Sequence, residues 1–300
     1  MVELHLLEAL DALLWLRSGD QVIQCYGVSA ASTSRYHRKC LQRFGLAMER
    51  WNGEWELVGD QSLLLRERQV HQLARWRGWR PLRLEASYWL GPTLREPALD
   101  GWLLGLANIV GVPRNLQLLQ ERIVDAWVGS FPDCPGADHP ALVTIPLTRM
   151  PVTFVVGEGH PLLRRARVTT ADVAAFPTLA LPEQAYPRVE QALKSLGLWN
   201  EDVPMTRYRR ELWEGRAERE LMVGYGTSFS LAVSGQGLHR LPLQLPFEAG
   251  DALVLQRCFL GHPRLRALLR QLHARLAPLV ERHDDVRFDP VLLEMVEGRG

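Results

Sequence analysis

The sequence lacks the features that mark several classes of protein. Its 300 residues contain four cysteines and no CxxC pair, and isolated cysteines in a chain of this length are typical of reduced thiols in a cytosolic protein. No stretch approaches the roughly 18 apolar residues of a membrane span. The apolar N-terminus also lacks the basic region of a signal peptide. We therefore expect a cytoplasmic protein without a membrane partner.

Signatures of catalysis are missing as well. The segment around Gly226 does not form a GxSxG nucleophile elbow, and Gly224-Tyr225-Gly226 lacks the third glycine of a dinucleotide fingerprint. Three histidines precede proline and have no helical i, i+4 partner that would suit a zinc ion, namely His139, His160 and His262. The sequence therefore predicts no catalytic residue, no metal site and no cofactor, and hence a protein that is not an enzyme.

A low net charge hides a local basic excess. The formal net charge is +1, which excludes a wholly basic nucleic-acid coat protein but allows a basic patch. Between Arg17 and Arg50, six basic residues stand against two acidic ones, Asp20 and Glu49, which leaves a local excess of four. Phosphate contacts with DNA need such an excess.

The same segment has the pattern of a helix-turn-helix. Leucines from Leu4 to Leu16 recur near the helical period. A short helix is expected over 21–26, ending at Gly27, and a third helix from Ser29 or Ser32 to Phe44. Two short helices joined by a glycine turn have the spacing of a helix-turn-helix. Asn52-Gly53 then predicts a tight hairpin, which would be a wing.

The candidate DNA-binding residues lie on the third helix and the wing. They are Ser29, Ala30, Ala31, Thr33, Ser34, Arg35, Arg38 and Arg50. Arg35 is placed either to read the edge of a guanine or to hold a phosphate, and the sequence leaves both roles open.

One more helix is expected over 60–78. Its apolar stripe consists of Leu63, Leu64, Val70, Leu73 and Trp76, and arginines form the charged remainder. Because this helix is too polar to stand alone, we expect the stripe to pair with the same helix of a second subunit. A two-fold dimer would set two recognition helices about 34 Å apart, or a multiple of that. Packing onto its own domain is the alternative.

From Leu82 onward, segments of strand and helix type alternate, which predicts an α/β domain. Strands are expected at 125–128, 152–156, 178–181, 221–223 and 252–255, and helices at 116–123, 170–174, 187–196 and 263–276. The segment from His283 is charged and is expected to be a loosely held tail.

These residues together resemble the LysR-type family of bacterial transcriptional regulators. Near the N-terminus, the family's pattern matches Ser18, Val28-Ser29, Ser34-Arg35 and Gly45-Leu46 without gaps. Further on, 152–162 is similar to the family's crossover strand with its Gly-His-Pro-Leu, and 168–173 to the helix that opens its second lobe. The segment 221–226 is similar to the family's Gly-x-Gly turn, and 262–268 to its last helix. The family's Gln-Pro at the start of the recognition helix is Ala30-Ala31 here, so a different base preference is expected.

The resemblance implies an all-α winged helix-turn-helix domain over 1–58 and a linker helix over 59–80. It also implies an α/β effector domain of two lobes, of the periplasmic-binding-protein type 2, over 81–282. Lobe I would span about 81–156 and 257–282, lobe II about 157–256, and a tail 283–300. Such a protein binds promoter DNA as a homodimer or homotetramer. A small-molecule effector between its lobes modulates that binding.

Candidate effector-binding residues follow the strands of both lobes, because ligands bind at the carboxyl ends of strands in such sheets. They are Ser87, Tyr88, Ser130, Phe131, Glu183 and Thr227. The aromatic residues Tyr88, Trp89 and Phe131 favour an aromatic or apolar ligand. Lobe I looks shortened between Ser87 and Asp125. The alternative function is a ligand-binding or scaffold protein with a vestigial DNA-binding domain and no specific operator.

Overall fold

Three helices and a hairpin form the N-terminal domain of the computed structural model, which describes residues 2–298. They are α1 (Leu4–Leu16), α2 (Gly19–Tyr26), α3 (Ala30–Phe44), β1 (Ala47–Trp51) and β2 (Glu54–Val58). The hydroxyls of Ser18 and Ser29 accept hydrogen bonds from first-turn backbone amides of α2 and α3, as N-caps do. Asn52 and Gly53 have φ angles of 46° and 79°, as a type I′ turn requires. The predicted helix pair and hairpin are therefore present.

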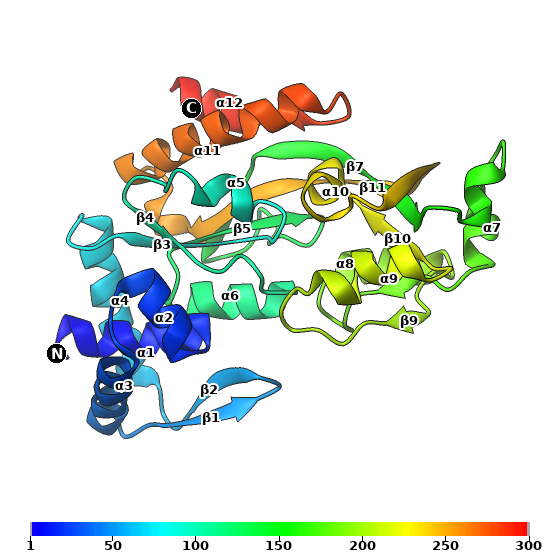
Figure 1. The fold of residues 1–300 in the computed structure, drawn as a ribbon. Coiled ribbons are helices and arrows are strands. Elements are labelled where there is room, and N and C mark those ends of the chain that lie inside the picture. The colour runs from blue at the N-terminus through cyan, green and yellow to red at the C-terminus, as the bar shows by residue number, and fades with distance from the viewer. Residues whose placement is uncertain (1, 299–300) are drawn as a thin grey trace.

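A mixed sheet of eight strands organises the rest of the chain (Figure 1), in the order β10-β7-β11-β5-β3-β4, with β12 on β7 and β6 on β11. Lobe I contains β3 (Leu82–Ala86), α5 (Gly91–Arg95), β4 (Trp102–Leu104), α6 (Val112–Gln120), β5 (Ala126–Phe131) and β6 (Leu142–Pro146). Strand β3 runs parallel to both β4 and β5. The interval from Ser87 to Asp125, which looked shortened, therefore holds two complete crossovers.

Lobe II is built on two long crossover strands, β7 (Thr148–Gly157) and β11 (Leu238–Gln256), which pair antiparallel. Its other elements are α7 (Thr170–Ala174), β8 (Leu179–Ala180), α8 (Pro187–Ser195), β9 (Glu201–Asp202), α9 (Glu214–Arg219), β10 (Val223–Gly226) and α10 (Ser228–Ser234). Strand β11 also pairs with β5 and β6 of lobe I, so the two lobes are joined through these crossover strands.

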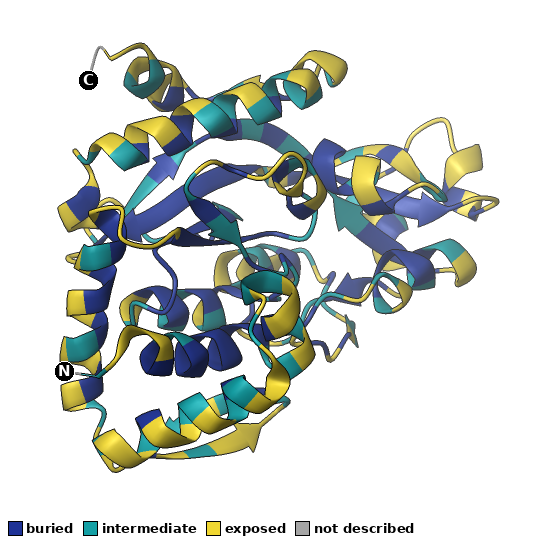
Figure 2. Ribbon diagram, turned by 60° about the vertical axis from the view of Figure 1, so that its left-hand side comes forward, coloured by how far each residue is buried: buried dark blue, intermediate teal, exposed yellow. Residues whose placement is uncertain are grey.

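Helix α1 joins the N-terminal domain to lobe I. Ten of its thirteen residues are buried (Figure 2), so it packs on more than one side, as a helix that is apolar all round must. One hydrophobic cluster runs from Leu10 of α1 through Cys40 of α3 to Leu119 of α6 and Val254 of β11. The N-terminal domain therefore shares a core with the effector domain.

Helix α4 (Ser62–Trp76) buries a different set of side chains from the predicted apolar stripe. Leu64 and Trp76 are buried, but so are two arginines of the supposed charged face, Arg68 and Arg75. Leu63, Val70 and Leu73 are 69%, 49% and 47% exposed. The buried side of α4 thus packs onto its own chain, which was the alternative expectation, and three of the five residues of the predicted stripe face outward.

The physical reason is a set of carboxylates that pair with those arginines. Arg68 Nε lies 2.9 Å from Asp11 Oδ1 and its Nη1 2.9 Å from Glu121 Oε2. Arg75 binds both carboxylate oxygens of Asp125 at 2.8 and 3.0 Å. Charged side chains are buried only when paired, and here the partners come from α1 and lobe I.

The predicted loose tail is wrong for the described part of that segment. After α11 (Pro263–Arg282), strand β12 (Arg287–Phe288) pairs with β7, and α12 (Pro290–Glu297) packs on α11. Leu292 is fully buried, and Asp289 accepts a hydrogen bond from Arg149 at 2.7 Å. A buried leucine and a paired acid hold this segment on lobe I. Residues 299 and 300 of the predicted tail lie outside the described residues.

Candidate functional site

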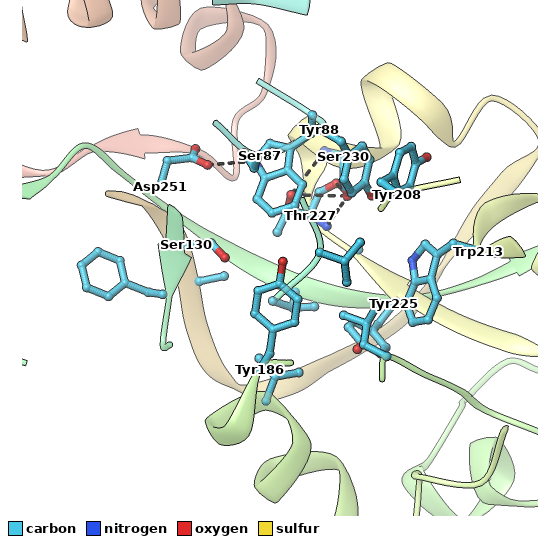
Figure 3. A pocket seen from close by; sticks show the side chains of 18 of the residues that line it. Ser87, Tyr88, Ser130, Tyr186, Tyr208, Trp213, Tyr225, Thr227, Ser230 and Asp251 are labelled. Carbon is cyan, nitrogen blue, oxygen red and sulfur yellow. Dashed lines mark hydrogen bonds between the residues drawn. The ribbon is translucent and has the colours of Figure 1, made fainter. Parts of the chain in front are cut away.

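A cavity of about 110 Å³ lies between the two lobes, beside the crossover strands (Figure 3). Five of the six predicted effector residues line it: Ser87, Tyr88, Ser130, Phe131 and Thr227. Each follows or ends a strand, as expected of ligand sites in α/β sheets.

Glu183, the sixth of these residues, does not line this cavity. Its neighbour Leu181 does, but Ala185 N donates to Pro182 O and closes a turn that carries Glu183 outward. The Glu183 side chain is 74% exposed and lies 3.8 Å from Lys194 Nζ.

The walls of the cavity are largely aromatic. Sequence reasoning had found Tyr88, Trp89 and Phe131 of lobe I. It had missed five further rings from lobe II and the crossover strand β11, namely Tyr186, Tyr208, Trp213, Tyr225 and Phe247. No local pattern marks them, because they stand in five separate segments that only the fold brings together.

Two stacked tyrosines connect the lobes across the cavity. The rings of Tyr88 and Tyr208 lie 3.5 Å apart between centroids, at an angle of 4°. Both hydroxyls donate to the carboxylate of Glu214, at 2.8 Å from Tyr88 and 2.7 Å from Tyr208. Burial, and the neighbouring Glu214 carboxylate, raise the pKa of Tyr88. Tyr88 of lobe I is therefore held to lobe II by one ring contact and one charge-assisted bond.

The charge at the cavity comes from Asp251 on β11, opposite Ser130 of β5. Its carboxylate is buried, and it accepts hydrogen bonds from Trp89 Nε1 and Thr148 Oγ1, each at 2.8 Å. Burial raises the pKa of Asp251 to about 6. Among the residues that the structure describes, Asp251 is the one charged side chain in the cavity lining, and no lysine, arginine or histidine joins it. Sequence reasoning missed this residue.

The candidate DNA-binding surface is the outer face of α3 and the wing. Ser29, Ala30, Ala31, Arg35 and Arg38 are exposed, and Ser34 is half-buried. Arg50 is exposed on the wing, with its guanidinium 5.5 Å from the centroid of the Trp55 ring.

Thr33, which the sequence also placed among the DNA-binding residues, is buried. Its side chain is only 2% exposed, so it cannot reach DNA in this conformation. Thr33 lies two helical turns before the buried Cys40, and residues seven apart share one helix face. That face packs against α1.

A buried polar contact fixes the wing to the effector domain. Arg207 of lobe II binds both carboxylate oxygens of Glu54 on β2, from Nε and Nη2, each at 2.8 Å. Its Nη2 also donates to Trp15 O at 3.2 Å. On the lobe I side, Trp15 Nε1 donates to the buried carboxylate of Glu85 at 2.5 Å. The N-terminal domain is thus attached to both lobes.

Two other kinds of site are absent from the described part of the chain. Within residues 2–298, no group of three or more His, Cys, Asp or Glu side chains is arranged to hold a metal ion. Over the same residues, no helix has the length and apolar character needed to cross a membrane.

The fold and the cavity between two lobes define a ligand-binding domain attached to a winged helix-turn-helix. A family model described as the LysR substrate binding domain matches residues 109–277. The chain therefore belongs to the LysR family of transcriptional regulators. A comparison with curated proteins by sequence finds no match.

Solved structures of full length support the same fold. A variant of OxyR from Pseudomonas aeruginosa is 18% identical over 92% of this chain and 95% of its own, with a TM-score of 0.55. BenM is 16% identical over 93% of this chain and 98% of its own, at 0.52. CbnR in complex with its target DNA is 12% identical over 91% of this chain and 99% of its own, also at 0.52. At these identities the likeness concerns the fold.

Proposed function

We propose that this chain binds promoter DNA and that a small-molecule effector in the cavity modulates this binding. The observation that carries the proposal is a pair of adjacent residues. Tyr208 forms part of the cavity wall, and Arg207, the preceding residue, binds Glu54 of the wing. A ligand that changes the position of Tyr208 must also act on the contact that holds the wing.

The effector needs a preference between two arrangements of the lobes, because a ligand shifts an equilibrium only by its differential affinity. The stack of Tyr88 on Tyr208 and their shared bonds to Glu214 define the closed arrangement. A ligand that separates these rings would favour a different arrangement of the lobes. The coupling to DNA would then run through Arg207 to the wing.

DNA docking is supported by the exposed basic side chains of α3 and the wing. Arg35 and Arg38 lie one turn apart on α3 and are both exposed, as is Arg50. Phosphate contacts from such residues supply most of the non-specific affinity for DNA. Base reading would come from Ser29, Ala30, Ala31 and Ser34 on the first turns of the same helix, together with Arg35 if it reaches a guanine.

The outward residues of α4 support a homodimer. Leu63, Val70 and Leu73 are exposed at spacings of seven and three, which place them on one helix face. A second copy of the same helix is the partner that a two-fold axis would supply. The cytoplasm is the compartment in which such a protein would meet its promoter.

A titration with the DNA upstream of the chain's own gene tests this function. Fluorescence anisotropy at several salt concentrations should show an affinity that falls steeply with salt. The double variant Arg35→Ala, Arg38→Ala should bind more weakly, with a salt slope smaller by about 0.9 for each phosphate that the variant no longer neutralises. The double variant Arg266→Ala, Arg270→Ala is the matched control, because both residues are exposed on α11 of the effector domain.

Equal decreases in affinity in the two double variants would contradict the DNA-binding surface. If the wild-type chain shows no salt-dependent binding, the alternative of a ligand-binding or scaffold protein with a vestigial N-terminal domain is correct.

A further inference from the structure

The cavity carries a negative charge on Asp251, and within residues 2–298 no cationic side chain lines the cavity to neutralise it. Both oxygens of Asp251 accept from neutral donors, the Trp89 indole and the Thr148 hydroxyl. Arg149, the next residue on β7, is paired with Asp289, and its guanidinium lies over the ring of Phe131 at 4.3 Å. A buried carboxylate without a cationic partner is unfavourable. A ligand could supply the missing positive charge.

The aromatic walls suit the same kind of ligand. The faces of tyrosine and tryptophan rings attract cations through their quadrupole, and cages of such rings recognise ammonium groups. Tyr88 and Tyr208 both donate their hydroxyl protons to Glu214, which places a second carboxylate behind the two rings. Trp213 and Tyr225 face the cavity from lobe II (Figure 3). The combination of rings and acids disfavours an anion.

A free polar group in the wall indicates that the ligand also makes a directional bond. The Ser87 hydroxyl is buried and has no hydrogen-bond partner among the described residues, and the same is true of the Tyr225 hydroxyl. Both residues line the cavity. Buried polar groups nearly always form hydrogen bonds, so a bound molecule with a donor or acceptor would supply the missing partners of these two hydroxyls.

The volume sets the size of the ligand. The cavity measures about 110 Å³, and an apolar cavity of about 150 Å³ in another protein holds benzene. A compact molecule, no larger than a single ring or a short branched chain, is therefore the scale that fits.

We propose that the effector is a small organic cation, an amine or quaternary ammonium compound with a compact apolar body, bound between Asp251 and the aromatic walls. The inference rests on the proposed function only in taking this cavity as the effector site. Asp251 neutralises the cation, the rings enclose it, and Ser87 and Tyr225 offer bonds to its polar hydrogens or substituents.

Three probes of one shape and different charge test the proposal on the full chain without DNA. Isothermal titration at pH 7.5 with cyclohexylamine, cyclohexanol and cyclohexanecarboxylate should give an affinity at least about tenfold higher for the amine than for the alcohol, a difference of 1.4 kcal/mol. The carboxylate should not bind. In Asp251→Asn the preference for the amine should disappear, while Asp138→Asn, an exposed acid outside the cavity, should behave as wild type.

A pH series on the wild-type chain provides a second readout if Asp251→Asn fails to fold. The other titratable groups that face the cavity are the phenols of Tyr88, Tyr186, Tyr208 and Tyr225, all with raised pKa values, with Glu214 behind two of them. The phenols stay neutral between pH 5 and 8. Protonation of Asp251 should therefore weaken the binding of cyclohexylamine about tenfold from pH 7.5 to pH 5, and that of cyclohexanol much less.

Equal binding of amine and alcohol, binding of the carboxylate, or no binding of the amine would overturn the proposal. Because DNA is absent, these results are independent of the DNA-binding function. Failure of the DNA titration described above with selective binding of the amine intact would reject only that function.

Discussion

Replacement of Arg207 by alanine is expected to loosen the wing from the effector domain. The side chains of Arg207 and Glu54 are only 8% and 10% exposed, and they share two hydrogen bonds of 2.8 Å. Loss of one partner of a buried ion pair costs about 3–5 kcal/mol. Arg17 and Arg114 remain 3.5 and 3.7 Å from the Glu54 carboxylate and keep part of it neutralised. We therefore expect a loss of about 2–3 kcal/mol at this interface.

The result should be visible as local opening. At 1.36 kcal/mol for each factor of ten, a loss of this size makes opening of the wing roughly 30–150 times more frequent. Hydrogen exchange followed by mass spectrometry should therefore show faster exchange of β1, β2 and the end of α1, where Arg207 also binds Trp15 O. Exchange of α11, on the far side of lobe I, should be unchanged.

Arg209→Ala is the matched control, because Arg209 is exposed two residues away. If Arg207→Ala leaves exchange of the wing at the wild-type rate, or if Arg209→Ala accelerates it equally, then Arg207 does not hold the wing.

Three other predictions concern the cavity and the helix α4. Tyr88→Phe keeps the stacked ring but removes the hydrogen bond to Glu214. The melting temperature of the ligand-free chain should therefore fall, in line with a loss of about 1.5–3 kcal/mol for a bond to a charged group. An unchanged melting temperature would mean that this bond does not stabilise the closed lobes. Leu73→Glu, on the outward face of α4, should convert a dimer to a monomer in sedimentation velocity, and Arg77→Glu, an exposed residue just past α4, should not; a Leu73→Glu dimer would exclude this face. Because burial raises the pKa of Asp251 from 3.8 to about 6, the folded state binds more protons than the unfolded state in that range, so this residue should lower the free energy of unfolding by roughly 2 kcal/mol as the pH rises from 4 to 6. That loss should be absent in Asp251→Asn when urea unfolding is measured across this range, and an identical pH dependence in both proteins would show that Asp251 ionises normally.

Local signals in the sequence were sufficient for the N-terminal domain. Capping serines, the Gly27 turn and Asn52-Gly53 act within a few residues of themselves, and the structure contains the helices and hairpin that they predict. Apolar runs likewise located the main strands, although only 252–255 was expected of β11, which spans Leu238–Gln256. Its first half contains two prolines, Pro242 and Pro246, which oppose a strand assignment.

The sequence failed where partners are distant along the chain. The face of α4 was assigned from hydrophobicity, whereas Arg68 and Arg75 are buried by acids 57 and 50 residues away. The cavity was found through residues that follow strands, but Asp251 lies within a strand, and its donors Trp89 and Thr148 are 162 and 103 residues away. Glu183 also follows a predicted strand, but this position does not reveal the turn that directs its side chain away from the cavity.

The most direct test of an effector that acts on DNA binding through Arg207 is a pair of DNA titrations with and without saturating cyclohexylamine. In the wild-type chain the amine should change the affinity for the promoter fragment about 5- to 150-fold, the usual range of coupling between two sites. Arg209→Ala should keep this change, and Arg207→Ala should lose it. An affinity for DNA that is the same with the cavity filled and empty, or a change that persists in Arg207→Ala, would contradict this mechanism.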